Sequence, residues 1–135
     1  MTTMKKKRPL FAARLIVSLL AMLTALTAWA DVSYSWDSGT KTLTITGTGA
    51  MDDSWYSVKP WYDNITSIEH IVINDGVTHI GNYSFYGCTN VTSVSIANSV
   101  TSIGVDAFQN CKSLASINIP EGVTTIENGA FSDCI

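Results

Sequence analysis

A repeat of 23 residues constrains the fold of this sequence more than any other feature. Four columns of one residue type recur at this interval: Phe85, Phe108 and Phe131; Cys88, Cys111 and Cys134; Val77, Val100 and Val123; and Ile80, Ile103 and Ile126. A single unit cannot bury its apolar columns, whereas stacked units bury them against one another. The sequence therefore predicts a solenoid of about three coils over residues 65–135.

The pattern within one unit predicts how each coil is built. Apolar and small polar side chains alternate over residues 91–96, which is typical of a half-buried strand. A turn at 97–99 then leads to a second extended segment at 100–103. Across 104–111 the apolar spacing becomes that of a helix or 3₁₀ turn, and we expect its Phe and Cys to point inward.

These motifs resemble the BspA-type leucine-rich repeat of surface and secreted proteins. The resemblance rests on residues 67–73, 75–81 and 84–88 with their copies 23 and 46 positions on, and it extends to the preceding segments 43–51 and 60–62. It implies a right-handed solenoid with a parallel sheet on the concave face. The convex segments would be extended, helical or 3₁₀, and the function would be binding or adhesion.

Residues 31–64 are expected to form an N-terminal cap that begins with a β-hairpin. Val32, Tyr34 and Trp36 alternate with polar residues, and a turn-forming segment separates them from a second alternating stretch at 42–46. A solenoid needs a cover over its first coil. The hairpin is therefore predicted to close that end.

Large aromatic residues between the hairpin and the first coil allow two interpretations. Trp55, Trp61 and Tyr62 could bury enough area to cover the coil, which is the interpretation we favour. The alternative is a carbohydrate platform made of Trp55, Tyr56 and Trp61. Tyr83 and Tyr86, on the convex side, are a second candidate patch, although we favour their interpretation as solvated turn residues.

Residues 1–30 have the three parts of a secretory signal peptide. A basic segment at Lys5–Arg8 precedes an apolar stretch at 15–26, and Ala28 and Ala30 supply the small residues for cleavage after Ala30. A retained membrane anchor is the alternative, but the apolar stretch is shorter than the roughly 20 residues that a span needs. The predicted product is secreted or displayed at the cell surface, with no stable insertion in a membrane.

Removing these thirty residues leaves a strongly acidic chain. Five of the eight Lys and Arg residues lie in the leader, so three remain against eleven Asp and Glu residues, a formal charge of −8. Such a surface repels phosphate backbones, which argues against nucleic acid as a partner. Extracellular or host proteins are the expected partners.

Three cysteines recur at one position of successive coils. Because stacked coils lie about 4.8 Å apart, their Cα atoms would fall within disulfide range. Each cysteine nevertheless shares the inward face with a phenylalanine, so we expect a buried column of thiols instead of a disulfide. The equal spacing provides no paired Cys-x-x-Cys, so no zinc site is predicted.

No catalytic residue, metal site or cofactor is predicted. His70 and His79 are the only histidines, and neither has a nucleophile and an acid assigned to it by the sequence order. His79 is interpreted as a solvent-facing variant of a position held by Ser102 and Thr125. The acidic residues lack the register of a calcium-binding repeat and are interpreted as solvated: Asp52, Asp53, Asp75 and Asp106.

The outward positions of the predicted concave strands form the candidate binding row. These positions are His70, Val72, Asn74, Ser93, Ser95, Ala97, Ser116, Asn118 and Pro120. The row lacks the Trp, Tyr and Arg anchors that usually dominate binding energy. Any single contact should be weak, and avidity over many copies would supply affinity.

The predicted function is therefore protein or host-surface binding by an exported, non-enzymatic repeat protein. The first alternative is a structural scaffold or a truncated fragment that docks on another chain, or on its own kind, through an uncapped C-terminal coil. A thiol enzyme is a remote alternative. Thiol labelling under native conditions would separate the enzyme from the other two.

Overall fold

The structure is a computed structural model that describes residues 3–7 and 31–135. The apolar core and cleavage point of the predicted signal peptide lie outside the described residues. Within them, no helix reaches the length and apolar character required to cross a bilayer.

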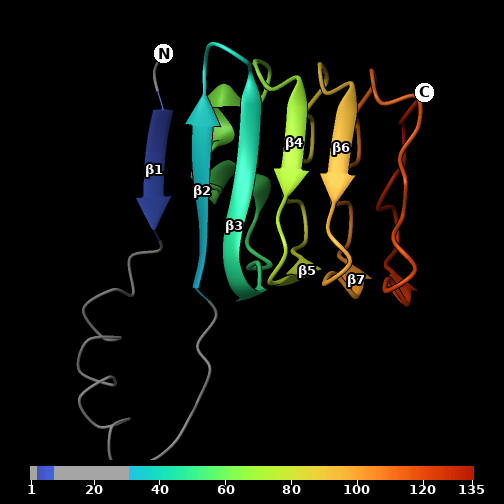
Figure 1. The fold of residues 1–135 in the computed structure, drawn as a ribbon. Coiled ribbons are helices and arrows are strands. Elements are labelled where there is room, and N and C mark those ends of the chain that lie inside the picture. Colours follow the sequence, from blue (N-terminus) through green and yellow to red (C-terminus); the bar gives the residue numbers. More distant parts are fainter. Residues whose placement is uncertain (1–2, 8–30) are drawn as a thin grey trace, which may run out of the picture.

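The chain begins with strands that pair side by side at one end of the molecule (Figure 1). β2 (Asp31–Asp37) and β3 (Thr42–Ala50) form the expected antiparallel hairpin, in which Tyr34 faces Ile45. β1 (Thr3–Lys7) lies antiparallel on the outer edge of β2. Alternation places the larger side chains of the hairpin in the core, because successive residues of a strand point to opposite faces.

The first strand of each coil extends this hairpin as a parallel sheet. β3 pairs with β4 (His70–Ile73), and β4 pairs with β6 (Ser93–Ile96) at an offset of 23 residues. Figure 1 shows β2, β3, β4 and β6 as one row across the front of the molecule. The predicted solenoid is confirmed, since the repeat in the sequence is the repeat of the strand register.

A second parallel row runs along another side of the coils. It consists of β5 (Val77–Ile80), β7 (Ser102–Ile103) and β8 (Thr125–Ile126). β3 joins both rows, because its end pairs with β5 after the chain passes Gly47 at a φ of 111°. A Cβ at Gly47 would lie 1.8 Å from the Asp31 carbonyl oxygen, so only glycine fits where β3 changes rows.

A file of aromatic rings fills the interior between these rows. Phe85 and Phe108 stack with centroids 5.1 Å apart, and Phe108 and Phe131 with centroids 5.3 Å apart. Trp61 from the cap extends the file, since its ring stacks on Phe85 at 5.7 Å. Cys88 and Cys111 are buried beside the file, and these two and Cys134 are free thiols.

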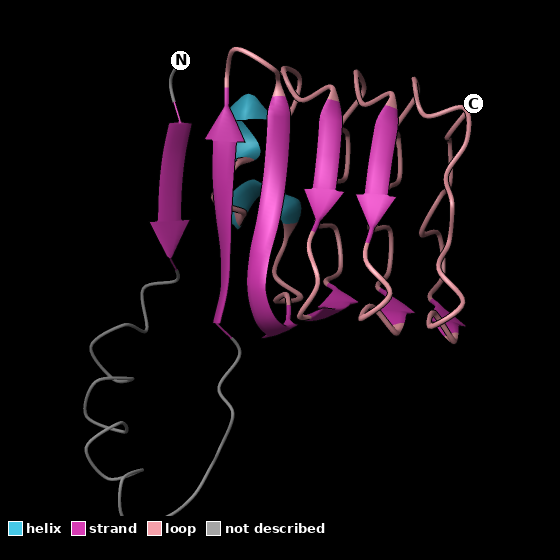
Figure 2. Ribbon diagram, in the orientation of Figure 1, coloured by secondary structure: helices cyan, strands magenta, loops and turns pink. Residues whose placement is uncertain are grey.

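The convex segments differ from the helical or 3₁₀ conformation expected at 104–111. Residues 82–87, 105–110 and 128–133 are turns. Among the described residues, 3₁₀ helices lie instead in the cap, as η1 (Tyr56–Val58) and η2 (Tyr62–Asn64) (Figure 2). Left-handed backbone interrupts each turn segment, for example at Asp106 and Asn110. Helical hydrogen bonding cannot continue through such residues.

The third coil lacks the strand expected around residues 116–119. In the first two coils, Asn74 N–H and Ala97 N–H donate to the carbonyl oxygens of Ile45 and Ile73 in the preceding strand, each at 3.0 Å. The equivalent residue of the third coil is Pro120, which has no N–H. The ladder therefore loses a hydrogen bond at the point where the strand would end.

Candidate functional site

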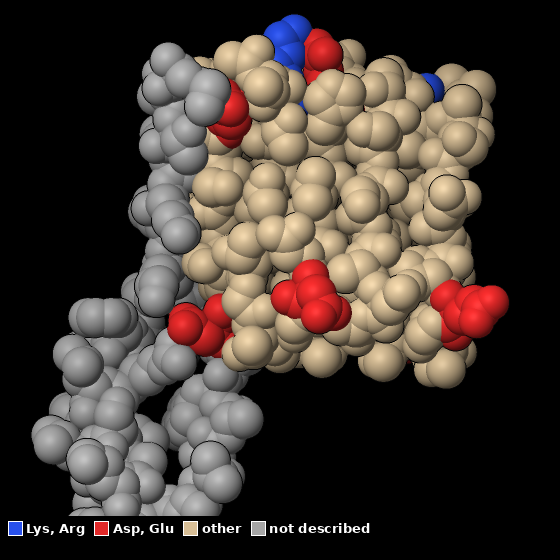
Figure 3. Space-filling model, in the orientation of Figure 1, with Lys and Arg blue, Asp and Glu red and all other residues tan. Residues whose placement is uncertain are grey.

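The outer face of the first parallel row, which we call the strand face, is flat and nearly free of charge. Side chains alternate along β4 and β6, so that Ile71 and Ile73 are buried whereas Ser93 and Ser95 are exposed. In Figure 3 this face is largely tan, with acidic and basic side chains gathered near its upper and lower borders. The face therefore offers neutral polar groups in a regular array.

The nine residues of the predicted row do not share one environment. His70, Val72, Ser93 and Ser95 lie on β4 and β6, and their registers place His70 beside Ser93 and Val72 beside Ser95. Asn74 and Ala97 follow directly after these strands. The three residues of the third coil lie outside any strand: Ser116, Asn118 and Pro120.

The hairpin lengthens the strand face beyond the predicted row. β3 places Thr42 beside His70 and Thr44 beside Val72. Sequence reasoning missed this extension because it treated the hairpin only as a cap. The alternation of threonines at 42–46 was visible, but their parallel pairing with the first coil was not.

A hydrogen bond between two side chains links neighbouring coils on the strand face. His70 Nδ1 and Ser93 Oγ are 2.7 Å apart. The two residues are separated by one repeat, so the stacking of coils brings them together. The bond orients the His70 ring on the face.

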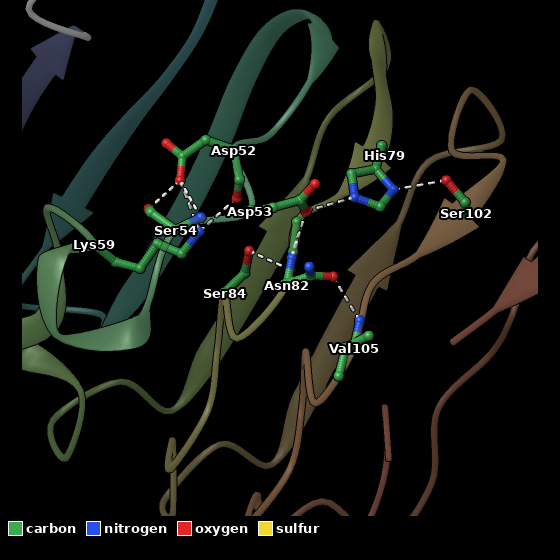
Figure 4. Close-up of polar contacts among 10 residues, drawn as sticks. Asp52, Asp53, Ser54, Lys59, His79, Asn82, Ser84, Ser102 and Val105 are labelled. Atoms are coloured by element: carbon green, nitrogen blue, oxygen red, sulfur yellow. Dashed lines mark hydrogen bonds and ion pairs between the residues drawn. The ribbon is translucent and has the colours of Figure 1, made fainter. Parts of the chain in front are cut away.

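A polar cluster joins the cap to the first two coils on another side (Figure 4). Asp53 Oδ1 lies 3.1 Å from His79 Nε2 and accepts from the Asn82 N–H at 2.9 Å. His79 Nδ1 lies 2.7 Å from Ser102 Oγ. The expectation of a merely solvent-facing His79 is wrong, because the ring bridges two segments and is only 21% exposed.

Asp53, His79 and Ser102 are the residue types of a serine-hydrolase triad, but the imidazole is reversed. In such triads Nε2 faces the serine and Nδ1 faces the carboxylate, whereas here Nδ1 faces Ser102 and Nε2 faces Asp53. An ionised Asp53 only accepts, so Nε2 donates to it, and in the neutral ring Nδ1 accepts from the Ser102 hydroxyl. The arrangement links the cap to the first two coils by hydrogen bonds, and it resembles a triad only in its residue types.

The same cluster contains a buried ammonium group. Lys59 Nζ donates to Asp52 Oδ1 at 2.9 Å and to the Asp52 carbonyl oxygen at 2.5 Å, and the lysine side chain is 2% exposed. Partial burial raises the pKa of Asp52, but hydrogen bonds from Ser54 and Lys59 and the charge of Lys59 outweigh it and hold this pKa well below its usual range. Sequence reasoning gave Lys59 no role because a lysine normally lies at the surface.

The aromatic residues before the first coil divide between the core and the surface. Trp61 is 5% exposed, contacts Tyr34 edge to face at 5.5 Å and stacks on Phe85 of the first coil. Trp55 and Tyr62 were also expected to cover the coil, but they are 61% and 38% exposed and do not do so. Trp55 instead stacks on Tyr83, and Tyr56 stacks on Tyr86, so exposed residues of the predicted platform meet the predicted convex patch.

Tyr83 holds an unusual backbone conformation at this surface. Its φ is +55°, and the equivalent residues Asp106 and Gly129 have φ values of +52° and +68°. Asp and Gly tolerate the left-handed region, whereas a bulky residue there is an outlier that costs on the order of 1–2 kcal/mol. The fold therefore keeps a tyrosine where its own repeat prefers smaller residues.

The thiols are poorly suited to nucleophilic chemistry. Burial raises the pKa of Cys88 far above its usual value and that of Cys111 to about 12. Burial also raises the pKa of Cys134. The thiolate is the reactive form, so these groups are largely inert near neutral pH.

No metal centre is found in the described part of the chain. Among residues 3–7 and 31–135, no three His, Cys, Asp or Glu side chains converge as ligands.

The profile of the BspA type leucine-rich repeat region matches residues 59–135 in six copies. No curated protein matches the chain.

Solved structures of bacterial leucine-rich repeat proteins are similar in fold. One from Eubacterium ventriosum ATCC 27560 is 38% identical with a TM-score of 0.65, over 70% of this chain and 25% of that chain. The T. pallidum leucine-rich repeat protein is 18% identical with a TM-score of 0.52, over 75% of this chain and 64% of that chain. The chain thus spans about a quarter of the first relative and less than two thirds of the second.

The repeat profile covers more than half of the sequence, and it coincides with the coils whose register repeats every 23 residues. The chain belongs to the BspA type leucine-rich repeat family.

Proposed function

We propose that this protein is an exported, non-enzymatic binding module that contacts other extracellular proteins through its strand face. Leucine-rich repeat proteins generally act by protein–protein interaction, and BspA-type members are typically secreted or surface proteins. The observation that carries the proposal is the continuous neutral face formed by β3, β4 and β6. A partner protein can cover this surface without removing charged side chains from water, which would cost free energy.

The chemistry of the face favours many weak contacts. Its side chains are mainly Thr and Ser, and it lacks the Trp, Tyr and Arg residues that usually dominate binding energy. Dense display on a surface would compensate, because a second contact of a tethered pair is effectively intramolecular. Binding should therefore depend steeply on the density of immobilised protein.

A surface-binding assay with extracellular-matrix proteins tests this function. The chain is immobilised at increasing density, and retention is expected to rise faster than density. Ser95→Arg places a large charged group in the middle of the strand face and should abolish retention. Ser132→Arg is the matched control, since Ser132 is exposed in the turn segment of the third coil. No retention at high density, or equal loss in both variants, would reject the strand face as the binding surface.

Export is tested separately by processing. In a host with a secretory pathway, the released protein should begin at Asp31, as N-terminal sequencing would show. Ala30→Leu removes the small residue before the expected cleavage point and should block processing, whereas Ala13→Leu should not. Release of a protein that retains residues 1–30 would contradict this part of the proposal.

A further inference from the structure

Five surface rings where the cap meets the first coil form an aromatic patch, which consists of Trp55, Tyr56, Tyr62, Tyr83 and Tyr86. Trp55 stacks on Tyr83 with centroids 4.4 Å apart and planes at 25°, and Tyr56 stacks on Tyr86 at 4.7 Å and 28°. Each pair joins one ring of the cap to one ring of the coil. The pairs adjoin each other, since Trp55 and Tyr56 are 6.4 Å apart, as are Tyr83 and Tyr86.

The patch is a second aromatic layer outside the core. The interior beneath it is already filled by Trp61 stacked on Phe85. Trp55 remains 61% exposed although its ring stacks on Tyr83. Exposed apolar area that the fold does not bury is a common mark of a binding surface.

The repeat itself does not require these rings. Tyr83 aligns with Asp106 and Gly129 in the next two coils, and Tyr86 aligns with Gln109 and Ser132. Tyr83 also keeps the left-handed backbone that suits its smaller equivalents better. Backbone strain retained at a surface site supports a functional role for the side chain that holds it.

The hydroxyl groups of the patch add hydrogen-bonding capacity. Tyr34 in the core donates its hydroxyl to the Pro60 carbonyl oxygen at 3.1 Å. By contrast, the hydroxyls of Tyr56, Tyr62, Tyr83 and Tyr86 make no hydrogen bond within residues 31–135. Asp106 and Gln109 lie one coil beyond the tyrosines, since Gly87 N–H donates to the Gln109 carbonyl oxygen at 2.8 Å. The patch therefore combines ring faces with free polar groups.

The charges around the patch exclude anionic ligands. Asp53 and Asp63 lie in the cap segment that carries three of the rings, and Asp106 lies one coil beyond the tyrosines. Lys59, the basic residue of the cap segment, is bound to Asp52. Like charges across an interface are repulsive. A cation could also contact an open ring face, but it accepts no hydrogen bond and would leave the donor groups of the tyrosine hydroxyls unused.

We propose that the aromatic patch binds neutral oligosaccharides. A pyranose ring presents C–H groups on its faces and hydroxyls around its rim. One sugar lies with its apolar face on the open face of Trp55, and its hydroxyls reach the tyrosine hydroxyls. The following sugars of the oligosaccharide extend toward Asp106 and Gln109. Trp and Tyr serve such a ligand well because each has an apolar body and a polar handle. This site lies on a different side of the coils from the strand face and is independent of protein binding there.

Isothermal titration calorimetry of the full chain tests the proposal. The probes are neutral hexasaccharides of glucose, mannose and N-acetylglucosamine, in β- and α-linked forms. At least one is expected to bind, and Trp55→Ala should weaken that binding by about tenfold or more. Tyr83→Asn removes a ring but keeps a residue that tolerates the left-handed backbone, so it should weaken binding while leaving the melting temperature nearly unchanged. Ser95→Arg, on the strand face, should bind the sugar as the parent does.

Three results would overturn the proposal. The first is the absence of binding by every neutral hexasaccharide at millimolar concentration. The second is binding that survives both Trp55→Ala and Tyr83→Asn in folded protein. The third is Trp55-dependent binding of trilysine or a proline-rich peptide in place of the sugars, which would assign the patch to another ligand class.

Discussion

The indole ring of Trp61 stacks on Phe85, and its N–H donates to the Ser84 carbonyl oxygen at 2.8 Å. The two rings are 5.7 Å apart with planes at 20°. A residue of the cap therefore takes the place that a phenylalanine of a preceding coil would hold. This contact joins two kinds of structure, a hairpin and a repeat, into one core.

Replacing Trp61 should destabilise the whole protein. Trp61→Ala removes a buried ring and leaves a cavity on Phe85, so the free energy of unfolding should fall by about 3–5 kcal/mol. Trp55→Ala provides a matched control, since Trp55 is 61% exposed, and a surface substitution changes this free energy by about 0.5 kcal/mol or less. Urea denaturation followed by circular dichroism measures both. Equal effects would mean that Trp61 is not the cap.

The left-handed positions predict which turn substitutions are tolerated. Gly87, Asn110 and Asp133 occupy equivalent places, with φ values of +74°, +62° and +58°. A side chain at Gly87 meets only Ile65 Cδ1 at 3.9 Å, so conformation and not space is limiting. Gly87→Asn should be nearly neutral, whereas Gly87→Val should cost on the order of 1–2 kcal/mol from backbone strain. Thermal denaturation of both variants checks this order, and an equal loss would point to crowding instead.

The thiol column should resist alkylation until the protein unfolds. Burial raises the pKa of Cys88 and Cys111, so little thiolate is present at pH values near 8. Cys134 is only half-buried and should react first. Iodoacetamide labelling followed by peptide mass spectrometry, with and without denaturant, gives the order. Rapid native labelling of Cys111 would contradict the buried column and revive the thiol-enzyme alternative.

Acid should weaken the attachment of the cap. The pKa of Asp52 is lowered in the folded protein, as is that of Asp53, so the ionised forms stabilise folding above the unfolded pKa of about 4. This stabilisation is lost as the pH falls through the lower, folded values. The urea midpoint should therefore drop below pH values near 4, and Asp52→Asn should reduce that drop. A control substitution at the exposed Asp75 should leave it unchanged.

The repeat made most of the fold predictable from the sequence. Columns such as Phe85, Phe108 and Phe131 specify which side chains stack, and the strand pairing of β4 with β6 follows from the same interval. The interval also predicts contacts between coils, such as His70 with Ser93. Periodicity gives such contacts without any knowledge of the turns.

The remaining features depend on residues outside the repeat. Asp53 reaches His79, and Lys59 is buried against Asp52, but neither cap residue belongs to a column. The turn conformation at Asp106 was missed because apolar spacing alone does not distinguish a helix from successive turns with left-handed residues. The aromatic patch was seen only as separate parts, since the distance between Trp55 and Tyr83 is set by how the cap folds back on the coil.

β1 has a consequence for maturation, because it belongs to the predicted leader and occupies the outer edge of β2. While residues 3–7 remain attached, the backbone N–H and C=O groups on that edge are paired. Cleavage after Ala30 would remove β1 and leave these backbone groups of β2 unpaired, so that another extended peptide could pair with this edge. The precursor and the processed protein would then share one interior but differ at one edge of the sheet, so that cleavage would also determine when this edge can pair with another extended strand.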